Sequence, residues 1–224
     1  MTMKLAKHSA PTAPAKLDAI LDQLATQLPN SGRLIFALDA TASRQPLWDT
    51  AIALQSDMFD TTAGSNLEIQ LVYYRGPKGE CKASSWITDT KRLRTIKSRI
   101  ICEGGYTQIA KVLSHAHREN EKSKIAALVF VGDAMEEKVD ELCDVASQLG
   151  APAFMFQEGH DGAAEQAFRE IARITRGAYA RFDASAPDQL RDLLKAVATY
   201  ASGGRQALAN RRDAGATLLL EQLK

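Results

Sequence analysis

The stretch LIFALDATAS, residues 34–43, decides the fold and also points to a site. Its first five residues are continuously apolar, which is typical of a central strand of a parallel sheet that is covered on both faces. Asp39, Thr41 and Ser43 follow at every second position where this strand ends. Because side chains alternate along extended backbone, this spacing directs all three oxygen-bearing side chains the same way. We therefore expect the strand to deliver a cluster of oxygen donors to one edge of a sheet.

The rest of the chain alternates strand-like apolar runs with helical patterns, which indicates a mostly parallel sheet with helices on both faces. After the first strand at residues 33–39, strands are expected at residues 67–74, 81–87, 125–131, 153–156 and 178–182. Helices are expected at residues 43–58, 89–100, 106–120, 136–149, 163–176, 187–200 and 205–223. The sequence Gly-Pro-Lys-Gly at residues 76–79 is a turn, so the second and third strands are predicted to form an antiparallel hairpin at the sheet edge.

Four segments are expected from composition and from the breaks in the pattern. Residues 1–14, rich in Ala, Pro and Lys, form a flexible leader, and residues 15–31 form an amphipathic helix. The α/β domain spans residues 32–202, and residues 203–224 form a helical extension that follows two consecutive glycines. The extension is expected to dock on the domain, although self-association or an acidic partner stays open.

Composition excludes several classes of protein. The net charge of +1 gives no whole-chain field that would attract nucleic acid or an anionic membrane. The leader has no apolar segment, so it is not a secretory signal, and no stretch is long enough to span a bilayer. Cys81, Cys102 and Cys143 lack metal-ligand spacing and are expected to be reduced thiols. We therefore expect a cytoplasmic protein.

Two further oxygen donors are predicted to join the first three. Thr107 lies in a turn after two glycines, and Asp133 directly follows the strand expected at residues 125–131. In an open parallel sheet, ligands bind beyond the carboxyl ends of the strands, so these side chains can converge with Asp39. A donor set of two carboxylates and several hydroxyls, without Cys or His, fits Mg²⁺ and argues against zinc. Two carboxylates only balance a divalent ion, so the metal can accept one more carboxylate from a partner.

These residues resemble the von Willebrand factor A (VWA) domain and its metal-ion-dependent adhesion site (MIDAS). The family pattern has Asp-x-Ser/Thr-x-Ser after the first strand, a Thr in the second loop and an Asp after the fourth strand. The matching residues are Asp39, Thr41, Ser43, Thr107 and Asp133.

The resemblance covers residues 32–201 and implies a Rossmann-like, three-layer α/β/α fold with one antiparallel edge strand. It also implies a Mg²⁺ or Mn²⁺ cofactor and a partner protein that contributes an Asp or Glu carboxylate. Intracellular bacterial members act as adaptors beside ATPases or in multi-protein assemblies. Ala42 and Ala134 stand where many members carry Gly, which leaves loop shape and metal affinity open.

Five residues flank the predicted metal site: Arg44, Gln45, Glu103, Tyr106 and Glu136. They are candidates for partner selection, and simple loop surface is the alternative reading. No clear base or nucleophile accompanies them, so binding rather than catalysis is expected.

Two other functions stay open. One is a magnesium-dependent phosphohydrolase with Asp39 as the nucleophile. Enzymes of the haloacid-dehalogenase type require a second Asp two residues later as the general acid–base. This chain has Thr41 at that position, which counts against a phosphohydrolase. The other is an RNA-associated scaffold that uses the basic helix at residues 89–100. That helix has no interleaved aromatic residues, and a solvated helix face is the favoured reading.

Overall fold

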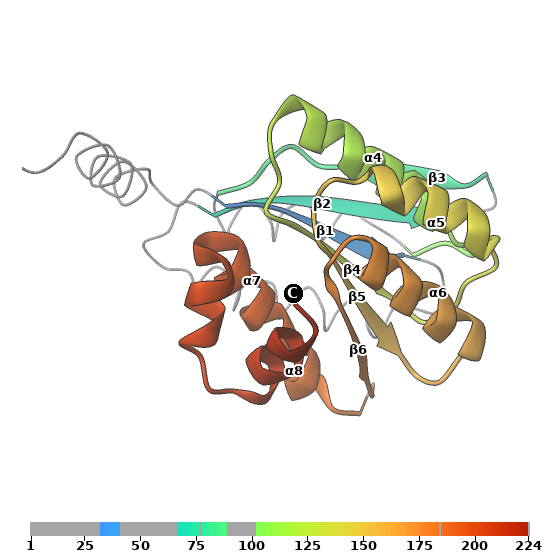
Figure 1. Ribbon diagram of the computed structural model, residues 1–224. Coiled ribbons are helices and arrows are strands. Elements are labelled where there is room, and N and C mark those ends of the chain that lie inside the picture. Colours follow the sequence, from blue (N-terminus) through green and yellow to red (C-terminus); the bar gives the residue numbers. More distant parts are fainter. Residues whose placement is uncertain (1–31, 41–66, 77, 89–101, 184, 224) are drawn as a thin grey trace, which may run out of the picture. The chain divides into compact units, whose positions relative to one another are not determined.

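The structure, a computed structural model, describes residues 32–40, 67–76, 78–88, 102–183 and 185–223 (Figure 1). The predicted leader, the first amphipathic helix and the helices expected at residues 43–58 and 89–100 lie outside these residues.

A six-stranded sheet forms the centre of the fold, with the strand order β3-β2-β1-β4-β5-β6. Its strands are β1 (Arg33–Asp39), β2 (Glu68–Arg75), β3 (Glu80–Ala83), β4 (Ala127–Gly132), β5 (Ala153–Glu158) and β6 (Ala178–Phe182). All neighbouring strands are parallel except β2 and β3, which form the predicted antiparallel hairpin at one edge. The predicted α/β fold class is confirmed.

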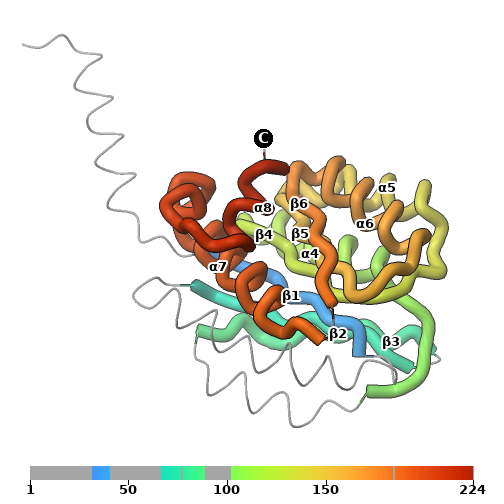
Figure 2. Tube along the Cα trace, turned by 90° about the horizontal axis from the view of Figure 1, so that it is seen from below, coloured from blue at the N-terminus to red at the C-terminus, as the bar shows by residue number. Residues whose placement is uncertain are grey.

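Helices cover both faces of this sheet (Figures 1 and 2). They are α4 (Ile109–Lys122), α5 (Val139–Gln148), α6 (Gly162–Ile174), α7 (Pro187–Ala209) and α8 (Ala214–Gln222). The first three pack on one face, and α7 and α8 pack on the other.

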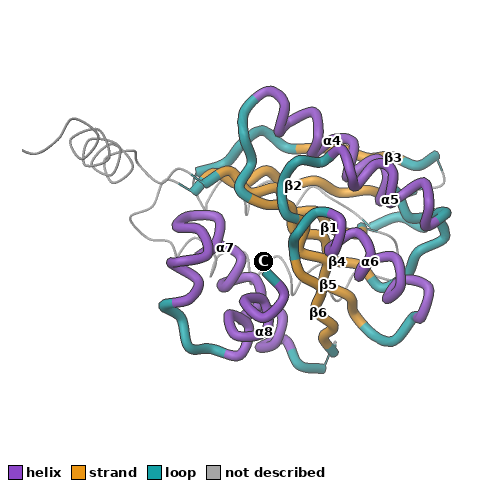
Figure 3. The backbone as a smooth tube through the Cα atoms, viewed as in Figure 1, coloured by secondary structure: helices purple, strands orange, loops and turns teal. Residues whose placement is uncertain are grey.

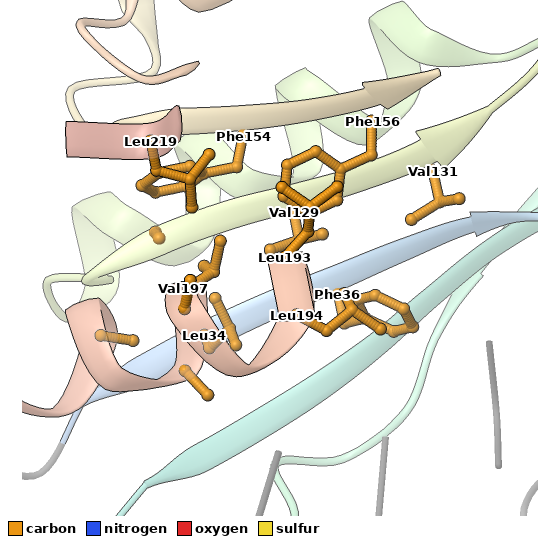
Figure 4. Packing of buried hydrophobic residues seen from close by; sticks show 14 of the residues in the cluster. Leu34, Phe36, Val129, Val131, Phe154, Phe156, Leu193, Leu194, Val197 and Leu219 are labelled. Atoms are coloured by element: carbon orange, nitrogen blue, oxygen red, sulfur yellow. The ribbon is translucent and has the colours of Figure 1, made fainter. Parts of the chain in front are cut away.

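The side chains of β1 alternate between the two cores. Leu34, Phe36 and Leu38 pack with α7 and α8, whereas Ile35 and Ala37 face α4 and its neighbours. In the first core, Leu194 of α7 lies beside Phe36, and Phe154 and Phe156 of β5 belong to the same cluster (Figure 4). Burial on both faces explains why this strand is continuously apolar, and it leaves only its carboxyl end for polar chemistry.

The third strand is shorter than predicted because a side chain interrupts its ladder. β3 ends at Ala83 rather than at residue 87. The backbone N–H of Leu71 donates to the Ser84 hydroxyl at 3.0 Å, while the Ser84 N–H donates to the Leu71 carbonyl at 2.8 Å. Pairing resumes only as an isolated bridge between Ile69 and Ile87.

The carboxyl-terminal helices complete the core beneath the sheet. Gly204, with φ of 66°, interrupts α7 at the glycine pair where a break was predicted. The chain then returns to the sheet, and α8 buries Leu219 against the same core as β1. Within the described ranges, no helix is both long and apolar enough to cross a bilayer.

Candidate functional site

Two neighbouring parallel strands place the predicted aspartates at one edge of the sheet. β1 and β4 pair from Leu34 opposite Ala127 to Leu38 opposite Val131. Asp39 is the last residue of β1, and Asp133 directly follows β4. The carboxyl ends of both strands therefore lie side by side. Asp39 is only 5% exposed and Asp133 is half-buried, so neither carboxylate is ordinary surface charge.

Thr107 lies in the irregular segment that precedes α4, which Figure 3 draws as a loop. The N–H of Glu103 donates to the carbonyl of Ala40, the residue after Asp39, at 3.1 Å. The Glu103 carbonyl in turn accepts from Gly76 in the hairpin turn at 3.2 Å. Thr107 is 4% exposed. The expected helix start at residue 106 is wrong, because α4 begins only at Ile109.

Two consecutive glutamates after β4 fix the position of this segment. The Glu136 carboxylate accepts from the Thr107 N–H at 2.9 Å and from the Thr107 hydroxyl at 2.7 Å. The Glu137 carboxylate accepts from the N–H groups of Ile109 at 2.6 Å and Ala110 at 3.0 Å. These acceptors satisfy N–H groups at the start of α4 that have no partner within the helix. The loop that carries Asp133 is thereby joined to the segment that carries Thr107.

The Thr107 hydroxyl keeps one free lone pair in this arrangement. It donates its proton to Glu136, and it accepts the Glu136 N–H at 3.2 Å. A hydroxyl has two lone pairs, so one remains for a cation. By accepting this hydrogen bond, the Glu136 carboxylate increases the electron density on the Thr107 hydroxyl oxygen. Outer carboxylates act in the same way on ligands at other metal sites.

The buried Tyr74 side chain shows that this edge is electronegative. Burial raises the pKa of its hydroxyl well above the ordinary value, and the neighbouring Asp39 carboxylate raises it further. Glu137 and Asp133 act in the same direction. Carboxylates from β1 and from the loop after β4 therefore all raise the pKa of one buried hydroxyl at this edge. Within the described part of the chain, no three His, Cys, Asp or Glu side chains form a group that could hold a metal ion by themselves.

Of the other predicted site residues, some lie outside the described part of the chain and others are exposed at the surface. Thr41, Ser43, Arg44 and Gln45 lie outside the described residues. Glu103 is exposed and forms an ion pair with Arg75 at 3.6 Å. Tyr106 is 69% exposed beside the buried Thr107.

Glu136 and Glu137 have structural roles that the sequence did not reveal. Glu136 is a candidate for partner selection, and in the structure its carboxylate also accepts from the N–H and the hydroxyl of Thr107. Glu137 carries no sequence signal that marks it as a site residue. Neither contact is local, since each crosses between two loops about 30 residues apart in the chain. The only signal was two adjacent acids soon after a strand end.

The residues present fit a hard divalent cation. Asp39 offers an oxygen ligand from the end of β1, and Asp133 and Thr107 offer oxygen ligands from two loops; none of these ligands is Cys or His. Thr41 and Ser43 continue directly from β1 and would supply further hydroxyls.

No protein-family profile and no curated protein sequence matches this chain. Solved structures do resemble it. An aerotolerance-related membrane protein from Bacteroides fragilis has a TM-score of 0.53 and 18% identity, covering 73% of this chain and 98% of that one. The VWA domain of SpRpn10 has a TM-score of 0.56 and 12% identity, covering 72% of this chain and 94% of that one.

The pilus adhesin SpaC from Lactobacillus rhamnosus GG has a TM-score of 0.59 and 8% identity. The match covers 78% of this chain but only 31% of the adhesin. At such low identities the likeness concerns the fold alone. Together with the strand order and the single antiparallel edge strand, it shows that the chain has a VWA-like fold.

Proposed function

We propose that this protein is a metal-dependent binding module that captures an acidic side chain of a partner protein. The cation, Mg²⁺ or Mn²⁺, would be held by Asp39, Asp133 and Thr107 together with Thr41 and Ser43. The observation that carries the proposal is that Asp39 and Asp133 lie at the adjacent carboxyl ends of β1 and β4, while the Glu136 carboxylate joins the loop after β4 to the Thr107 hydroxyl.

The charge balance of the ligands explains why a partner would be needed. Asp39 and Asp133 neutralise a divalent ion, and the hydroxyl ligands add no charge. When bound, the cation supplies an electrophilic position that a partner's carboxylate can fill. Tyr106, the neighbour of Thr107 in the chain, offers an exposed aromatic surface, and aromatic residues are enriched in interface cores. An adaptor role in the cytoplasm, beside an ATPase or within a multi-protein assembly, follows from the resemblance to VWA domains.

Metal binding is the first test of this proposal. We expect titration calorimetry with Mg²⁺ and Mn²⁺ to show one binding site in the full chain and none in Asp39→Asn or Thr107→Val. Both variants preserve side-chain size, and circular dichroism will report whether they fold. Asp144→Asn removes a charge from an exposed position on α5 and serves as the control. Equal metal affinity in Asp39→Asn and in the control would contradict the proposed ligand set.

The capture of a carboxylate needs a second measurement. We compare the proteins that crosslink to three samples: the wild type in Mg²⁺, the wild type in EDTA, and the Asp39→Asn variant in Mg²⁺. We expect a set of partners that requires both the metal and Asp39, and crosslinks that map next to Asp or Glu residues of the partner. A partner set that is unchanged by EDTA would refute metal-dependent capture.

A further inference from the structure

The outer edge of β3 is open among the described residues. β3 is the last strand at its end of the sheet. The Ser84 N–H donates to the Leu71 carbonyl, and hydrogen-bonded pairs recur at every second residue of an antiparallel ladder. The backbone groups of Glu80 and Lys82 therefore face β2, whereas those of Cys81 and Ala83 face away from the sheet. Outward N–H and C=O groups of this kind can pair with another extended chain.

A groove runs beside this edge, between β3 and α4. Its volume is about 370 Å³. Cys81 and Ala83 form part of its floor, because they pair with Tyr74 and Val72, whose side chains pack under α4. Both floor residues are small, so they leave space next to the helix. We call this feature the β3–α4 groove.

The helix wall of the β3–α4 groove is basic. Lys111, Ser114, His115 and Arg118 lie on one face of α4 at helical spacing. Lys111 and Arg118 are exposed, and both line the groove together with Cys81. Burial raises the pKa of the Cys81 thiol, and the positive charges of Lys111 and Arg118 oppose this rise. Among the described residues that line the groove, none is acidic.

The spacing of the two cations fits an extended ligand. Seven residues of α-helix separate Lys111 from Arg118, a rise of about 10 Å. Three residues of extended chain also span about 10 Å. Lys111 of α4 reaches the start of β3, because its ammonium donates to the Gly79 carbonyl at 2.8 Å. His115 of α4 lies nearer the far end of β3, where its ring forms a hydrogen bond with Gln70 at 2.8 Å. The basic wall therefore follows the direction of the open edge.

We propose that the β3–α4 groove binds an extended acidic segment of a partner protein, which adds a strand to the open edge of β3. Backbone pairing with Cys81 and Ala83 supplies the affinity, and carboxylates of the segment meet Lys111 and Arg118. This surface is separate from the candidate metal site and does not require the cation.

The test uses fluorescently labelled peptides and the full chain. The first peptide alternates Glu with Val and Thr. The second has the same sequence with a methyl group on every backbone nitrogen, which removes the N–H donors of both edges but keeps the charge. The third replaces Glu with Lys. We expect anisotropy to show binding of the first peptide alone, unchanged by EDTA or by Asp39→Asn. Equal binding of the methylated peptide would overturn strand addition.

Protein variants test the two parts of the groove separately. Lys111→Glu with Arg118→Glu is expected to weaken binding about tenfold or more, since two ion pairs become repulsive. Lys124→Glu with Lys138→Glu makes the same change in charge outside the groove and should have no effect. Ala83→Pro removes only an outward N–H, which edge strands tolerate, and should also abolish binding.

Hydrogen exchange gives an independent measurement that needs no variant. The acidic peptide should slow exchange at the amides of Cys81 and Ala83 and leave β6 unaffected. If inorganic polyphosphate binds the groove while the acidic peptide does not, the groove is a polyanion site and the proposal is wrong.

Discussion

The Glu136 carboxylate holds Thr107 by both its N–H and its hydroxyl. Glu136 itself is exposed, so it can be changed without opening the core. Its position outside the predicted ligand set resembles that of the outer carboxylates that orient ligands at other metal sites. A substitution of Glu136 therefore changes how Thr107 is held without changing any of the proposed metal ligands.

Glu136→Ala is expected to weaken Mg²⁺ binding about tenfold or more, because the Thr107 hydroxyl loses the group that orients it. Glu136→Gln keeps a carbonyl acceptor and should recover part of the affinity. Titration calorimetry measures both, with Glu121→Ala, an exposed change on α4, as the control. If Glu136→Ala binds as tightly as the control, Thr107 is not positioned in this way.

At the scale of elements, α4 connects the candidate metal site to the β3–α4 groove. The N–H groups of its first two residues donate to the Glu137 carboxylate, which lies in the loop after β4. Its far end carries the buried Glu119, which accepts from Trp86 at 3.0 Å and lies 3.5 Å from the Arg33 guanidinium. Between these ends lies His115, whose ring is half-buried and bonded to Gln70.

His115 makes stability depend on pH. Burial lowers the pKa of its ring below the ordinary 6.5; Arg118 and Lys122 also lower it, and Glu119 opposes them. The unfolded chain therefore takes up this proton more readily than the folded one. The contribution to stability is fully present above pH 6.5 and is lost as the pH falls below that value.

Urea unfolding from about pH 7.5 to about pH 5 tests this dependence. His115→Gln keeps a hydrogen-bonding side chain beside Gln70 but does not titrate, so its free energy of unfolding should fall less steeply than that of the wild type. His160→Gln changes a histidine that lies outside α4 and serves as the control. Identical pH profiles for the wild type and His115→Gln would contradict the assignment.

The strands and the start of α4 show what the sequence can predict. The predicted β1 and β6 boundaries match the structure, because an apolar run bounded by polar or turn residues is a local signal. α4 begins later than predicted because Glu136 and Glu137 bind the backbone ahead of it and at its start. Those partners are distant in sequence, so no local pattern could indicate them. The positions of Asp39 and Asp133 were predictable from strand ends, whereas the clamp on Thr107 was not.

At the scale of the whole molecule, the two edges of the sheet differ. The outer edge of β6 is covered where the Gln222 amide of α8 accepts from the Tyr179 N–H and donates to the Tyr179 carbonyl, both at 2.9 Å. At this one residue, a side chain thus makes the hydrogen bonds that a neighbouring strand would make. The opposite edge, at β3, has no equivalent cover among the described residues.

Gln222→Ala should lower the free energy of unfolding by about 1–2 kcal/mol, because two backbone groups of Tyr179 lose their partners. Amide exchange at Tyr179 should become faster while exchange in β1 stays slow. Glu221→Ala, the exposed neighbour, is the control for a change in the same helix. Unaltered exchange at Tyr179 would show that the amide does not protect this edge.

The covered edge at Tyr179 limits how this protein can assemble. A module with two open edges can join copies of itself end to end into a filament, because each copy offers both halves of the contact. Here the Gln222 amide already occupies one half of that contact. Copies of this protein would therefore not join through both β3 and β6, and β3 is left as the edge at which a partner strand can add.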